Sequence, residues 1–228
     1  IQVVTNAGNT PTALGDTAHG TVINGTGILR FRGASGTTSE PIEVNGIHTS
    51  GSIDNYVGSV TINGPVTLNH DASFGIHDWA SGGAAGVKRD SSINGVIAEG
   101  AGGPHNVYFL GNLSGSSAQG TESRKGEMIL GAQSTYGGDT YVTTNKANDV
   151  TTGKFSGNLR LSTNDALPVG TTLTLGGAHT SGSVTLGVGG GNGKFALGGH
   201  NQELAGLLTN GSGTENRVVG NSPTLSTL

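Results

Sequence analysis

A histidine, three hydroxyl side chains and a glycine occur together twice, as His-Thr-Ser-Gly-Ser at 48–52 and again at 179–183. A serine beside a histidine could act as a nucleophile next to its base. A hydrolase of the elbow type, however, carries Gly-x-Ser-x-Gly between a long strand and a helix. Here the pentapeptide lies between short segments without a helical pattern. We therefore interpret Ser50 and Ser181 as parts of scaffold turns.

A second group of polar residues lies in the segment Asn-His-Asp-Ala-Ser-Phe-Gly-Ile-His-Asp-Trp-Ala at 69–80. It contains two His-Asp pairs and the single tryptophan: His70-Asp71, His77-Asp78 and Trp79. Histidine and aspartate could bind a divalent metal, and the indole ring could stack on a sugar. The odd spacing of seven would place the two pairs on opposite faces of a strand. The preferred interpretation is a polar loop with one anchoring aromatic residue, and no metal site is predicted.

The remaining acidic residues are spread thinly. A polysaccharide-cleaving β-helix needs clustered carboxylates on one face, and the nearest groups are Glu40 with Glu43 and Glu122 with Glu127. We interpret both groups as solvated edges. The Gly-Gly-Asn-Gly-Lys-Phe segment at 190–195 lacks the Gly-Lys-Ser/Thr ending of a phosphate loop and the aspartate of a calcium repeat. The sequence predicts no catalytic, cofactor-binding or metal-binding residue, and hence no enzyme.

Composition narrows the class of protein. Glycine accounts for 43 of 228 residues, charged residues for 11% and aromatic residues for 4%, the net charge is −4, and cysteine is absent. The lysines and arginines are scattered, so nucleic-acid binding is not expected. No run of about 18 apolar residues is present, so membrane insertion is not expected. Without cysteine there is no disulfide framework.

Apolar residues alternate with polar ones over four to six positions, which is typical of short strands. The segments with this pattern are GILRFRG, PIEVNG, SVTING, PVTLNH, NVYFLG, EMILG, NLRLS, TTLTLGG, GSVTLGV and GKFALGG. Asn-Gly pairs, which tolerate turns, begin at Asn24, Asn45, Asn63, Asn94, Asn192 and Asn210. The best helical candidate, at 201–208, is interrupted by Gly206. The chain is predicted to be all-β.

Internal repetition favours a solenoid over a sandwich or barrel. Residues 42–53 align without a gap to 173–184, and Leu-Arg-Phe at 29–31 aligns to Leu-Arg-Leu at 159–161. We predict a single β-solenoid over 1–228, a parallel β-helix with Gly/Asn corners, containing internal repeats at approximately 15–125 and 138–228. A coil of about 20 residues is expected.

The second half resembles the autotransporter-associated β-strand repeat of secreted passenger proteins. The resemblance is carried by GEMILGAQSTYGGDTYV at 126–142, LRLSTNDALPVGTTLTLGG at 159–177 and GKFALGGHNQELAGLLTNGSGTENRVVGNSPTLSTL at 193–228. Ser134-Thr135-Tyr136 replaces the Asn-Thr-Tyr of the usual pattern, and residues 51–76 resemble the linking part of such arrays. The resemblance implies a parallel β-helix outside a bacterial cell.

We therefore expect a non-enzymatic, extracellular or cell-surface structural protein. One version is a self-assembling fibre or surface-layer subunit, whose open strand edge near Leu228 pairs with another copy of the chain. A second version is an adhesive segment of a longer passenger, which packs against its neighbouring coils. Its candidate contacts with surface glycans are the loop at 77–92 and the stretch at 118–126. A carbohydrate-active β-helix enzyme is the alternative from a different class.

Overall fold

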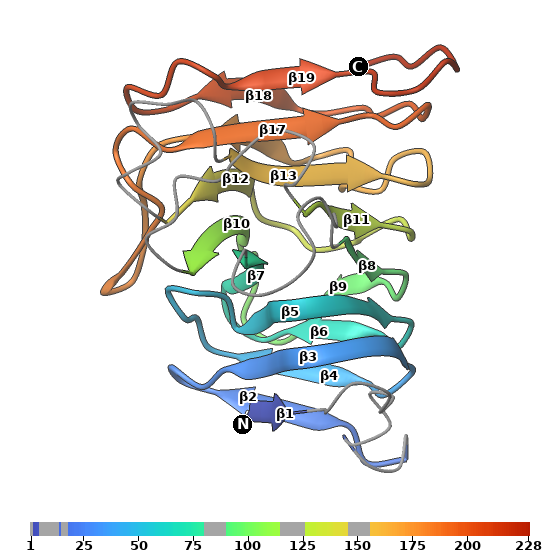
Figure 1. The fold of residues 1–228 in the computed structure, drawn as a ribbon, viewed down its shortest axis with the longest axis vertical. Helices are drawn as coiled ribbons and strands as arrows, with labels where there is room; N and C mark the ends of the chain where they lie inside the picture. Colours follow the sequence, from blue (N-terminus) through green and yellow to red (C-terminus); the bar gives the residue numbers. More distant parts are fainter. Residues whose placement is uncertain (1, 5–13, 15–17, 80–89, 115–125, 146–155) are drawn as a thin grey trace.

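The computed structural model describes residues 2–4, 14, 18–79, 90–114, 126–145 and 156–228. These residues form many short strands joined by turns, with almost no helix. The strands are stacked along the longest axis of the molecule, and the two termini lie at opposite ends (Figure 1). The prediction of an all-β chain is confirmed, and the ten alternating segments all contribute strand residues.

The strands lie in three rows, and parallel neighbours within a row follow one another along the chain. The first row contains β1 (Gln2–Val4), β3 (Leu29–Thr38), β5 (Ile53–Ile62), β7 (Ala72–Trp79), β10 (Val107–Ser114), β12 (Thr140–Thr144), β14 (Thr172–Leu175) and β18 (Gly206–Thr209). β3 and β5 are long enough to enter the second row as well. The first half of β5 pairs with β7 and its second half pairs with β8.

The other two rows complete the arrangement. The second row continues from β3 and β5 into β8 (Ser91–Ile93), β11 (Met128–Leu130), β13 (Ser156–Leu161), β17 (Asn192–Ala196) and β19 (Arg217–Val219). The third row contains β2 (Thr21–Asn24), β4 (Ile42–Asn45), β6 (Val66–Leu68) and β9 (Ile97–Glu99). One antiparallel pair, β15 (His179–Ser181) with β16 (Val184–Leu186), forms a hairpin outside the rows.

The distance along the chain between paired strands is longer than expected. Ile42 pairs with Thr21, 21 residues before it, but Met128 pairs with Ser91, 37 residues before it. The expected length of about 20 residues per coil therefore matches only the shortest segments between paired strands. The discrepancy arises because the segments between strands differ in length while the paired strands keep their register.

Alternation along each strand produces continuous apolar columns across the strands. In β6, Val66 and Leu68 are buried while Thr67 between them is partly exposed. Through successive pairings, the first row aligns a column of buried side chains: Leu29, Ile53, Phe74, Phe109, Val142 and Leu175. Each such side chain contributes about 1.5–3 kcal/mol on burial. These columns form one core along the stack.

Asn-Gly pairs form stacked corners at the ends of four strands. At the end of the third-row strands, Asn45 Nδ2 donates to Asn24 Oδ1 at 2.9 Å. At the end of the second-row strands, Asn94 Nδ2 donates to Asn63 Oδ1 at 3.1 Å. The Asn-Gly pair at Asn192 lies in a strand instead, because Asn192 begins β17 and is buried. Gly193 follows it inside the strand, where its backbone approaches the Val142 carbonyl.

The aligned repeat segments occupy different rows. Ile42–Asn45 is β4 of the third row, whereas the aligned 173–175 lies in β14 of the first row. Likewise, 29–31 begins a first-row strand and 159–161 ends a second-row strand. Similar sequence in these segments therefore reflects a shared need for alternating strands. The duplicated unit itself stays a prediction.

We predict that Gly95→Ala lowers the free energy of unfolding by at least about 2 kcal/mol. A methyl group on Gly95 would overlap the backbone carbonyl of Gly64 in the corner below it. Gly170→Ala is the matched control, because a methyl group there meets nothing within 4 Å. Urea unfolding measures both variants. Equal stability of the two variants would contradict close stacking of the Asn-Gly corners.

Candidate functional site

The two His-Thr-Ser-Gly-Ser copies adopt different structures. The first copy forms the turn between β4 and β5, where His48 Nδ1 accepts the backbone N–H of Ser50 at 3.0 Å. In the second copy, His179–Ser181 is strand β15 of the hairpin. There, the Ser181 hydroxyl donates to Asp71 Oδ2 at 2.6 Å, and His179 Nε2 lies 2.7 Å from the Gly176 carbonyl. The prediction of a turn is confirmed for Ser50, whereas it is wrong for Ser181, which lies in a strand.

The hairpin brings the two copies together on the outer side of the first row. Four buried side chains form a small apolar cluster there: Ile47, Tyr108, Leu110 and Leu186. Tyr141 packs against it, with its ring 4.7 Å from that of Tyr108 and 4.4 Å from the His179 ring. Asn145 joins the first copy to the end of the hairpin, since its amide donates to the Thr49 carbonyl and its oxygen accepts the Gly187 N–H. The hairpin thus fastens onto the first turn.

Asp71 begins a ladder of side-chain oxygens that accept backbone N–H groups. Asp71 Oδ1 accepts the Asn106 N–H at 2.7 Å, and Asn106 Oδ1 accepts the Asp139 N–H at 2.9 Å. Asp139 Oδ1 then accepts the Thr172 N–H at 3.0 Å. Each acceptor lies just before a first-row strand, and each donor belongs to the next passage along the stack. The three side chains act as structural acceptors at one corner.

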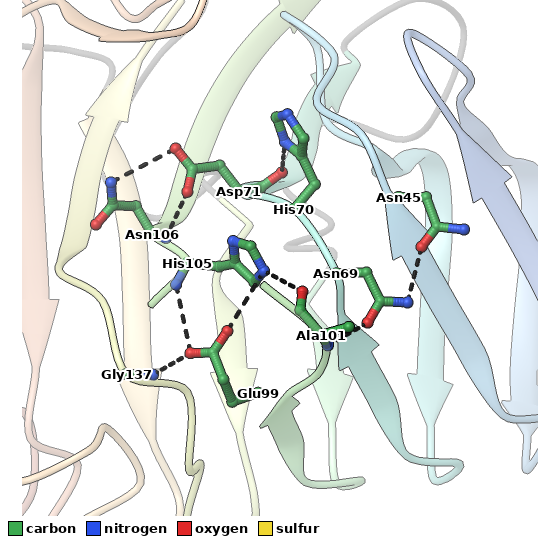
Figure 2. A network of polar contacts seen from close by, with 9 residues as sticks. All are labelled: Asn45, Asn69, His70, Asp71, Glu99, Ala101, His105, Asn106 and Gly137. Carbon is green, nitrogen blue, oxygen red and sulfur yellow. Dashed lines mark hydrogen bonds and ion pairs between the residues drawn. The ribbon is translucent and has the colours of Figure 1, made fainter. Parts of the chain in front are cut away.

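A neighbouring network of polar contacts holds the turn between β9 and β10 (Figure 2). Glu99 Oε2 accepts backbone N–H groups from His105 and Gly137. The His105 ring nitrogen Nε2 lies 2.9 Å from the Ala101 carbonyl and 3.6 Å from Glu99 Oε1. Asn69 accepts the Ala101 N–H and donates to Asn45 Oδ1. The polar groups of this network hold backbone and one another, and they leave no arrangement of nucleophile and base.

The most concentrated set of charged and aromatic side chains lies on β3, β5 and β7. This Asp54 cluster consists of Arg30, Arg32, Asp54, Tyr56 and His77. Asp54 is fully buried, and its Oδ2 accepts a hydrogen bond from Arg30 Nε at 2.7 Å. Its Oδ1 lies 2.9 Å from His77 Nε2, but outside hydrogen-bond geometry. The His77 ring is tilted against Tyr56, with centroids 4.7 Å apart.

Sequence reasoning missed the Asp54 cluster and assigned His77 to a different hypothesis. The His-Asp pairs do not converge, because His70 is exposed and Asp71 supports the corner ladder. The side chains of Asp78 and Trp79, and most of 77–92 and 118–126, lie outside the described residues. Within the described part of the chain, no group of three or more His, Asp or Glu side chains could hold a metal ion. One sequence signal could have revealed the cluster. Arg30, Asp54 and His77 lie at outward-facing positions of three adjacent strands, β3, β5 and β7.

The prediction that the acidic pairs are solvated edges is wrong for two residues. Glu40 is only 3% exposed and accepts a hydrogen bond from the Thr21 hydroxyl at 2.5 Å. Glu127 is 2% exposed, 2.9 Å from Arg160 Nε and 3.3 Å from Lys194 Nζ. The stack places these cations beside Glu127 although they are 33 and 67 residues away along the chain.

The remaining residues of the two acidic groups are Glu43 and Glu122. Glu43 accepts a hydrogen bond from Asn69 at 2.8 Å, and Glu122 lies outside the described residues. The segment at 190–195 lies largely in β17.

Comparison of the chain with family models, with curated proteins and with solved structures found no match. Among the residues that the structure describes, no helix is long and apolar enough to cross a membrane. The site is therefore interpreted from its own geometry.

We predict that stability falls as the pH is lowered from 7.5 to 5. Burial, and then the Arg30 guanidinium, hold the pKa of His48 below its ordinary value, and burial lowers the pKa of His179. In the unfolded chain both residues bind protons near pH 6.5, at about their ordinary pKa. The folded state resists this protonation, so its advantage is complete above pH 6.5 and is lost below it.

The double variant His48→Asn with His179→Gln tests this prediction by urea unfolding at both pH values. Asparagine keeps an acceptor for the Ser50 N–H, and glutamine keeps a donor for the Gly176 carbonyl. The stability of the variant should depend less on pH than that of the unaltered chain. An identical loss in both proteins would mean that these two histidines are not responsible.

Proposed function

We propose that this chain is a parallel β-helix that serves as a non-enzymatic structural rod on the outside of a bacterial cell. The observation that carries the proposal is the buried column from Leu29 to Leu175, which crosses six parallel strands. Such columns are expected where a chain winds in successive coils and each coil stacks on the one before. The resemblance of 126–228 to secreted passenger repeats supports the location.

The described carboxylates favour a structural role over carbohydrate cleavage. Glycoside hydrolysis uses two carboxyl groups that flank the scissile bond and exchange protons with it. In contrast, Asp71 and Asp139 accept backbone N–H groups across the stack. Asp54 is fully buried against Arg30 and His77. These carboxylates therefore contribute to the architecture.

The proposal of self-association is supported by the end strands of two rows. β18 and β19 each pair with a single neighbour and stand at the ends of the sheet order. Leu207 and Leu208 of β18 are 44% and 56% exposed. An open strand edge with exposed apolar side chains is a template for pairing with another strand. We infer that another copy of the chain stacks on this edge and extends the rows into a filament.

Electron microscopy across a concentration series tests the function. We expect filaments of constant width that lengthen as the protein concentration rises. Leu208→Lys should prevent this growth, because a charge on an edge strand opposes pairing. Val169→Lys is the matched control, since Val169 is 45% exposed but lies in the loop between β13 and β14 and not in an edge strand.

Isolated rods at every concentration would contradict the fibre function and favour the adhesive segment of a longer passenger. Equal inhibition by both lysine substitutions would contradict stacking through β18.

A further inference from the structure

A bulge directs Tyr56 into the middle of the Asp54 cluster. Along the pairing of β3 with β5, Asn55 pairs with Phe31 and Val57 pairs with Arg32, so the register passes over Tyr56. Bulges of this kind re-aim a side chain and are frequent beside binding sites. The Tyr56 ring lies 5.0 Å from the Arg30 guanidinium carbon and 5.6 Å from that of Arg32.

Stacking on an aromatic ring prepares a guanidinium group to bind an anion. The ring contacts the face of the charged group, whereas the N–H donors point outward from its edge. A carboxylate or sulfate accepts two such donors side by side. Arg30 already donates to Asp54 through Nε. Arg32 is exposed, and among the described residues no carboxylate is paired with it.

His77 adds a second, independent feature of a binding site. It is 8% exposed, and its Nε2 lies 2.9 Å from Asp54 Oδ1, whereas its buried Nδ1 has no hydrogen-bond partner in the described structure. Buried polar atoms normally have a partner, so an unpaired Nδ1 beside an aromatic ring requires an explanation. A polar ligand group at the edge of the cluster would supply a partner for Nδ1.

We propose that Arg30, Arg32, Tyr56 and His77 form a binding site for the carboxylate or sulfate group of an acidic polysaccharide. Arg32 is the principal contact, Arg30 the second cation, Tyr56 the platform for both, and His77 a further polar contact through Nδ1. The site would lie on the outer surface of the stack. The proposal does not depend on whether the chain forms filaments.

The surroundings favour a polysaccharide over an acidic peptide. The same two strands carry exposed hydroxyl side chains beyond the cluster, namely Ser35, Thr37 and Ser59. Hydroxyl groups both donate to and accept from the hydroxyl groups of sugars. Among the described side chains of β3 and β5, no large hydrophobic residue is exposed, so a peptide would find little apolar surface to cover.

Titration calorimetry with the full chain tests the site, with polygalacturonate and dextran sulfate as anionic probes and dextran as the neutral one. We expect binding to at least one anionic polymer and none to dextran. Arg32→Ala should weaken that binding about tenfold or more, since a charge-assisted contact is lost. Arg217→Ala, which removes an equivalent charge from β19 at the end of the second row, should leave it unchanged.

Four outcomes would overturn the proposal. Binding of neither anionic polymer would exclude the site. Equal weakening by Arg32→Ala and Arg217→Ala would mean that net charge alone attracts the polymer. Free galacturonate binding as tightly as its polymer would mean a small-anion site. Tighter binding of polyglutamate than of either polysaccharide would mean a peptide site.

Discussion

Backbone N–H groups at the corners of the stacked rows need acceptors that the strand ladders do not supply. An unpaired buried N–H costs about 1–3 kcal/mol, and every passage of the chain turns several times. Asp71, Asn106 and Asp139 meet this need at one corner, where each carries an oxygen to the N–H of the following passage. Elsewhere, Asn164, Asp165 and Asn201 do the same near the end of the stack. The columns of the core depend on these corners for their register.

The same constraint accounts for the composition. Stacked corners at Gly64 and Gly95 leave no room for a side chain, and the asparagines before them bond to each other. Polar side chains therefore mainly form hydrogen bonds with backbone groups. The Asp54 cluster departs from this use, because its cations and aromatic ring face outward around a bulge and the Nδ1 of its imidazole has no hydrogen-bond partner. That departure is the reason for placing a ligand there.

Strands could be predicted from sequence because their signal is local. Alternation in Val66–Leu68 or Ile42–Asn45 is visible in three or four letters, and each appears as a strand. Contacts between passages could not be predicted in this way. Glu127 meets Lys194 across 67 residues, and Asp54 meets Arg30 across 24 residues. These contacts depend on unequal loop lengths, which a local sequence pattern does not show. The buried ion pair of Glu127 was therefore interpreted as a solvated edge, and the Asp54 cluster was missed.

The corner ladder is tested most directly at Asp139, by amide hydrogen exchange at Thr172 together with urea unfolding. In Asp139→Ala the Thr172 N–H loses its acceptor, whereas Asp139→Asn keeps an oxygen in the same position. We expect the alanine variant to lose about 1–3 kcal/mol of stability and the protection of Thr172. The asparagine variant should retain most of both. If both variants kept full protection at Thr172, the side-chain acceptors would not be what holds successive passages in register.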